Sequence, residues 1–135
     1  MALFAFTGNG TTVTGAGLGG YTGSVISIGE WSESIDEVDV NYLGTSGHDN
    51  HIPGDLTHHG QVNMTVQFSP SGTTGRPTLG SVGTITITYA DGATCAGTGF
   101  VTAYGFNNIA NNERIEATLT FRWDGDTGPA YTDAP

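Results

Sequence analysis

The chain has 135 residues and a formal net charge of −10, with 22 glycines and no lysine. This length favours one domain, because domains typically run to roughly 100–150 residues. The only strong cations are Arg76, Arg114 and Arg122, so the chain lacks the basic surface that holds nucleic-acid phosphates or anionic membranes. The absence of lysine also excludes Schiff-base chemistry and a P-loop lysine.

Hydrophobic residues make up 36% of the chain and fall in alternating runs, which disordered acidic chains lack. A single cysteine, Cys95, excludes an intrachain disulfide. The first ten residues lack the basic region of a signal peptide. No stretch approaches the ~20 apolar residues of a membrane-spanning helix. We therefore expect a folded protein with no membrane partner.

The N-terminal quarter of the chain contains three segments of different composition. Residues 1–7 predict a short apolar edge, and residues 8–23 predict an arm rich in glycine and threonine. Residues 24–31 alternate apolar side chains with serine and predict a strand.

Residues 34–43 fit two patterns. The spacing of Trp31, Ile35 and Val38 matches a helix, but the β-branched residues favour a strand with an irregularity at Asp36–Glu37. We choose the strand. From residue 44 to residue 60 we expect a long loop.

The rest of the chain alternates strongly between apolar and polar residues. Asp91-Gly92 predicts a hairpin turn, and the prolines and glycines of 69–81 predict a connection. Strands are predicted at 61–68, 82–90, 93–104 and 113–123. Strands with one apolar and one polar face are typical of an all-β, antiparallel β-sandwich or partly closed barrel with little helix. We divide the chain into an arm (1–23), a sandwich domain (24–128) and a tail (129–135).

The four histidines form the best metal candidate in the sequence: His48, His51, His58 and His59. Imidazole suits zinc or nickel, but Pro53-Gly54 breaks any helix that would align these ligands. A polar loop that is rich in histidine is the simpler interpretation. The acids of 30–39 match a carboxylate pair only loosely, and Cys95 fits a small packed residue. We therefore expect no enzyme, no cofactor and no metal.

Several segments in the same order resemble the major tail tube proteins of long-tailed, siphovirus-like bacteriophages. The segments are 31–43, a glycine loop at 44–47, an Ile-Pro-Gly turn at 52–54, and the strand 60–68, followed by 85–92, 99–105 and 113–121. The match covers about residues 24–128. It departs from the family at 69–81, where a helix is usual and this chain is broken by proline and glycine.

The resemblance implies a structural virion protein that polymerises as stacked, hexameric rings to form the tail tube, a conduit for DNA ejection. Its partners would be other copies of itself, the tape-measure protein, and the tail terminator and tip proteins, with double-stranded DNA passing transiently. It would be assembled in the host cytoplasm and located in the virion tail. An alternative is a monomeric binding module, an adhesin or glycan-binding domain, with Trp31, Tyr104 or Trp123 stacking on sugars.

Two surfaces follow from the tube hypothesis. Ring-to-ring contacts are expected from apolar and glycine positions of the arm and the long loop: Val13, Leu18, Tyr21, Leu43, Gly44, Gly47, Ile52, Pro53, Gly54 and Leu56. The polar strand faces are expected to line the lumen through Asn63, Thr65, Gln67, Thr84, Thr86, Thr88, Glu116, Thr118 and Thr120. The acids of 30–39 would add negative potential there. Arg114 and Arg122 are expected to pair with carboxylates across a subunit boundary.

Overall fold

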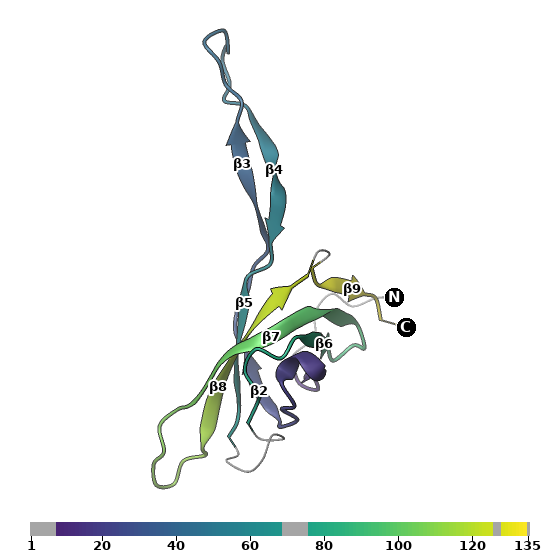
Figure 1. Cartoon of the computed structure of the whole chain (residues 1–135), viewed down its shortest axis with the longest axis vertical. Coiled ribbons are helices and arrows are strands. Elements are labelled where there is room, and N and C mark those ends of the chain that lie inside the picture. The colour runs from purple at the N-terminus through teal and green to yellow at the C-terminus, as the bar shows by residue number, and fades with distance from the viewer. Residues whose placement is uncertain (1–7, 69–75, 126–127, 135) are drawn as a thin grey trace.

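The computed structural model describes residues 8–68, 76–125 and 128–134, which form a curled antiparallel sheet and a projecting two-stranded hairpin (Figure 1). The sheet contains β1 (Thr12–Thr14), β2 (Val25–Ile28), β5 (Gln61–Gln67), β6 (Gly83–Thr88), β7 (Thr94–Phe106), β8 (Glu116–Asp124) and β9 (Ala130–Thr132). Its order is β1-β6-β7-β8-β5-β2, with β9 paired to β7. The hairpin consists of β3 (Ser34–Asp39) and β4 (His51–His58).

Strict alternation along three strands builds the core. Each of β5, β6 and β8 places every second side chain inside, and these inner side chains are apolar. The buried set is Val13, Leu18, Tyr21, Val62, Met64, Val66, Ile85, Ile87, Cys95, Val101, Ala117, Leu119, Phe121 and Trp123. Since strands form within the predicted ranges 61–68, 82–90, 93–104 and 113–123 and pair antiparallel, the all-β, antiparallel fold class is confirmed.

The sheet curls toward closure but stays open. Residues 8–11, next to β1, and residues 25–31, which include β2, line a common groove of about 720 Å³. A second groove of about 540 Å³ is lined by residues 11–15 and 20–25. The two end strands therefore face each other across a seam. The fold is sandwich-like, and its apolar face is covered largely by the curl of the sheet itself.

The N-terminal arm belongs to the core of its own subunit. It contains β1, which pairs with β6, and a short 3₁₀ helix, η1 (Ala16–Leu18), which packs against β6 and β7. A side chain at Gly17 would lie 2.6 Å from the Gly83 carbonyl oxygen, so only glycine allows this approach. The arm is thus a structural part of the sheet. Among the described residues, no helix is long and apolar enough to cross a membrane.

The predicted loop at 44–60 is wrong in its second half, because residues 51–58 form β4. Pro53-Gly54 suggested a break, but in a two-stranded ribbon both strands are edges, where a residue without an N–H is tolerated. The expected irregularity at Asp36–Glu37 is confirmed as a register shift between Ile35 and Glu37. The predicted tail at 129–135 contributes β9, which pairs with β7. The predicted apolar edge at 1–7 and most of the connection at 69–81 lie outside the described residues.

The arm's place in the core can be tested with two leucines. Leu18 is 1% exposed and Leu43 is fully exposed. We expect Leu18→Ala to lower the free energy of unfolding by about 2–5 kcal/mol, because it leaves a cavity in the core. Leu43→Ala should change it by less than about 0.5 kcal/mol. Urea unfolding of the two variants measures both values, and equal effects would contradict the placement of the arm.

Tyr21 makes stability depend on alkaline pH. Its hydroxyl donates a hydrogen bond to the Gln67 carbonyl at 2.6 Å, and burial, with a smaller effect of Tyr104, raises its pKa to about 12. Below the unfolded pKa of about 10, the tyrosine is protonated in both states. Between pH 10 and 12 the unfolded chain ionises first, so stability is lost. Unfolding free energies at pH 9 and pH 11 should fall less steeply for Tyr21→Phe than for the wild type, and identical slopes would contradict this assignment.

Candidate assembly surfaces

The β3–β4 hairpin projects from the sheet as a long ribbon with both faces exposed (Figure 1). Val38 lies opposite Ile52 in its register, and apolar side chains continue toward the tip. The exposed apolar residues of the hairpin are Ile35, Val38, Val40, Tyr42, Leu43, Ile52 and Leu56. Two-stranded hairpins are marginally stable alone in water, and exposed apolar groups of this extent mark interaction sites. The hairpin is therefore the strongest candidate for a contact with another chain.

The expected ring-to-ring residues separate into two groups. Leu43, Gly44 and Gly47 lie in the exposed turn of the hairpin, and Ile52, Pro53, Gly54 and Leu56 lie on β4. Val13, Leu18 and Tyr21 are 7%, 1% and 3% exposed. The expectation that these three side chains contact another ring is wrong, because they are buried in the core of their own subunit.

The histidines do not converge on one site. His51 lies 3.9 Å from Asp49, His58 lies 3.4 Å from Asp36, and His59 lies 3.5 Å from Glu33. These three imidazole–carboxylate pairs are spread along the hairpin. His48 lies in the exposed turn, where its carbonyl accepts a hydrogen bond from Asn50.

A threonine-rich face covers the outer side of the sheet. The cross-strand pairs Asn63–Thr120, Thr65–Thr118 and Gln67–Glu116 join β5 to β8. Thr120 donates a hydrogen bond to Asn63 at 2.8 Å, and Thr118 donates one to Asn107 at 3.0 Å. On the β6 side, Thr84, Thr86 and Thr88 occupy the same face, opposite the buried isoleucines. The structure thus places all nine expected lumen residues on one polar sheet face.

The same face continues onto two strands that the sequence reasoning did not include. Thr12 and Thr14 of β1 pair with Thr88 and Thr86, and Thr94 and Thr98 of β7 pair with Thr88 and Thr84. The signal was present in the alternation of threonine with valine at 12–14. The predicted arm had no assigned strand, so this alternation was not used.

Charge on this face is sparse. Arg114 pairs with Glu116 of the same chain at 3.0 Å, and its expected pairing across a subunit boundary stays a prediction. Arg122 is exposed, and no carboxylate lies within ion-pair distance of it in the described part of the chain. The acids of 30–39 belong to the hairpin and to the segment before it, so they do not contribute to the threonine face.

The three aromatic side chains expected to stack on sugars, Trp31, Tyr104 and Trp123, are partly or fully buried. Trp123 is 5% exposed, and its ring contacts Trp31 and Phe121 at centroid distances of 6.2 and 5.2 Å. Tyr104 is half-buried and stacks on Phe68. These contacts remove the sequence-based support for a glycan-binding module.

The single cysteine is a packed core residue. Cys95 is fully buried, and burial raises the pKa of its thiol. A neutral, inaccessible thiol is not a nucleophile.

We compared the chain with protein families, with curated proteins and with solved structures. No family model matches the chain, and no curated protein matches its sequence. A chain of the anti-feeding prophage baseplate, in a six-fold symmetrised structure, aligns with a TM-score of 0.63 at 10% identity, over 81% of this chain and 80% of that one. The chain therefore shares its fold with a chain of a phage-like baseplate. A chain in the tail of the empty GTA particle, with C6 symmetry, aligns with a TM-score of 0.59 at 16% identity, over 82% and 84%.

A chain of the native gene transfer agent virion aligns equally well, with a TM-score of 0.58 at 15% identity, over 82% and 85%. At these identities the likeness concerns the fold alone. The resemblance to tail tube proteins that the sequence motifs indicated is confirmed at that level.

Proposed function

We propose that the chain is a structural subunit of a tail tube, built as stacked rings of six copies through which double-stranded DNA passes. The observation that carries this proposal is the tail-assembly fold, shared over about four fifths of the chain with components of particles that have six-fold symmetry. The apolar side chains of the hairpin support it, because they are exposed to solvent in an isolated subunit.

Stacking follows from apolar groups at opposite ends of the subunit. The hairpin extends from one end, and the loop between β7 and β8 lies at the other (Figure 1). This loop region exposes Phe106, Ile109 and Ile115. A contact between two different surfaces of identical chains is heterologous, and it propagates as a filament where its rotation does not close into a ring. The hairpin of one ring would therefore pack against the loop end of the next ring, which produces a tube.

Ring closure is assigned to the strand edges. β1 and β2 are the two ends of the sheet path, and exposed edges invite pairing with another chain. Lateral pairing around a ring would satisfy these edges and join the threonine faces of neighbouring subunits into one wall.

The threonine face is suited to the wall of a DNA channel. Double-stranded DNA carries one negative charge per ~1.7 Å, so a basic wall would retain it. Hydroxyl and amide side chains present no such charge, and the pairing of Arg114 with Glu116 neutralises one of the few cations. The net charge of −10 adds to the repulsion.

A tube subunit of this kind would be made in the host cytoplasm and end in the tail of the virion. Its partners would be other copies of itself, a tape-measure protein inside the tube, and terminator and tip proteins at the ends. The exposed hairpin and the loop end are the surfaces available to those end proteins.

The stacking role of the hairpin is tested by charging its apolar positions. Leu43→Asp with Leu56→Asp should abolish tubes while leaving the subunit folded, because both side chains are exposed and a buried contact would lose apolar area. Light scattering and negative-stain microscopy measure assembly, and circular dichroism measures folding.

A matched control is Leu79→Asp with Val82→Asp, at exposed apolar positions outside the hairpin. This pair should assemble as the wild type does. Tubes in the hairpin variant, or equal loss of tubes in both variants, would show that the hairpin is not the stacking surface.

The lumen assignment is tested by adding positive charge to the threonine face. Gln67→Lys with Thr84→Lys should make assembled tubes retain a short DNA duplex at low salt, and the retention should fall steeply as salt rises. Co-sedimentation of tubes with labelled DNA measures it. Ser81→Lys with Ala90→Lys adds the same charge at exposed positions outside the strands. Equal retention by both variants would contradict the lumen assignment.

A further inference from the structure

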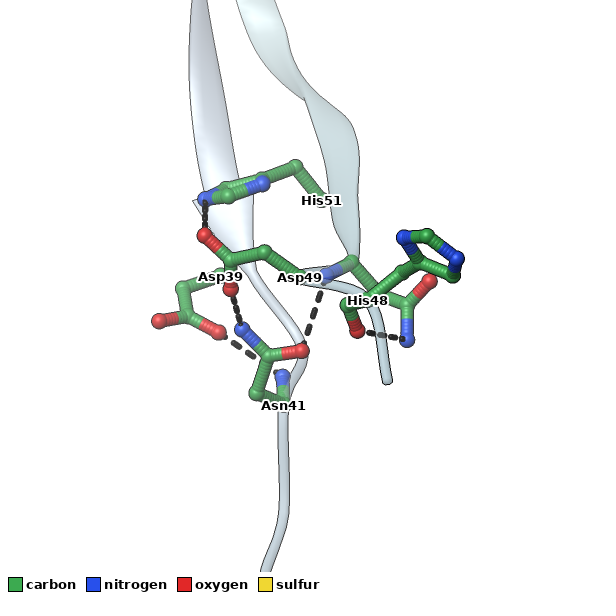
Figure 2. Close-up of polar contacts among 6 residues, drawn as sticks. Asp39, Asn41, His48, Asp49 and His51 are labelled. Atoms are coloured by element: carbon green, nitrogen blue, oxygen red, sulfur yellow. Dashed lines mark hydrogen bonds and ion pairs between the residues drawn. The ribbon is translucent and has the colours of Figure 1, made fainter. Parts of the chain in front are cut away.

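Three side chains with metal-binding atoms meet at the tip of the hairpin. Asp39 ends β3, His51 begins β4 opposite it, and Asp49 lies in the turn between them. Their carboxylate oxygens and imidazole nitrogen lie within 4.8 Å of one another. Figure 2 shows the His51 ring directed toward the Asp49 carboxylate, with Asp39 beside it. The ligands thus come from both strands and from the turn.

Neighbouring amides orient these carboxylates. The Asn41 side-chain amide donates a hydrogen bond to Asp49 Oδ1, and the Asn41 backbone N–H donates one to Asp39 Oδ1 at 2.7 Å. The side-chain Oδ1 of Asn41 in turn accepts a hydrogen bond from the Asn50 backbone N–H at 2.8 Å. Partners of this kind position ligands around metal ions in proteins. The second oxygen of Asp49 remains directed toward His51 Nε2, at 3.9 Å.

The hairpin contains no permanent cation that would offset these carboxylates. Between residues 33 and 60 the sequence has six acidic residues, four histidines, and neither lysine nor arginine. Carboxylates alone would suit magnesium or calcium and would not specify a site. The imidazole changes the donor set, because one nitrogen with two carboxylate oxygens suits zinc and related divalent ions.

We propose that Asp39, Asp49 and His51 bind one divalent transition-metal ion, for which zinc is the probe, and that the ion joins β3 to β4 at the hairpin tip. Zinc bonds of about 2.1 Å need ligand atoms roughly 3.4 Å apart, so the three exposed side chains close in by about 1 Å through rotation. A fourth position is open to water or to a group from a neighbouring chain. The bound ion fixes the turn that carries Leu43.

Zinc titration of the metal-free full chain by calorimetry at pH 7.5 tests the site. We expect one zinc per chain, and His51→Gln or Asp39→Asn should weaken binding at least about tenfold. The matched control is the pair His58→Gln and Asp36→Asn. These residues form an imidazole–carboxylate contact of 3.4 Å on the same hairpin without a third ligand, so their substitution should leave the affinity unchanged.

Amide chemical shifts of the wild type locate the ion independently of any variant, and zinc should shift residues 39–51 selectively. Sub-stoichiometric binding, shifts elsewhere, or equal weakening by the control variants would overturn the proposal. Zinc binding is measured whatever the assembly state. A chain that binds zinc but forms no rings contradicts the tube proposal alone, and rings without zinc binding contradict the metal proposal alone.

Discussion

The two-faced character of the strands is the constraint on which the structure depends. Each main strand has one apolar and one polar face, so the sheet has a single face to bury. A flat sheet of this kind would leave its core in water. The sheet therefore curls until β1 and β2 face each other across a seam, with η1 and Tyr21 adding cover. The outer face is polar because the residues that alternate with the buried ones are mostly threonine, asparagine and glutamine.

The β3–β4 hairpin contributes no residue to the buried core of the sheet. It extends the chain beyond the sheet and carries apolar side chains that no residue of the described subunit buries. Its polar groups include three imidazole–carboxylate pairs. The subunit thus satisfies its own core and leaves apolar contact area at both ends of its long axis. The proposed assembly into stacked rings would explain this division, because a second ring would cover these apolar surfaces.

The sequence predicts the sheet well and the hairpin poorly, for physical reasons. Alternation with period two is strong in 61–68, 82–90 and 113–123, because one face of each strand is buried. The strand at 51–58 is exposed on both sides, so no alternation marks it, and Pro53-Gly54 suggests a break. The sequence predicts Val13, Leu18 and Tyr21 in ring-to-ring contacts, because a segment so rich in glycine does not show the alternation that marks a buried face. Gly17 is required by the close approach of β6, and a sequence does not display that approach.

Copies of this chain are proposed to stack as rings with the threonine face inside. Cryo-electron microscopy of the purified full chain would show this arrangement. We expect stacked six-fold rings, with the hairpin of each ring lying on the loop end of the next and Thr84, Thr118 and Thr120 lining the channel. A 13.9 kDa monomer at every concentration, or rings with the buried β5 and β8 face toward the channel, would contradict it.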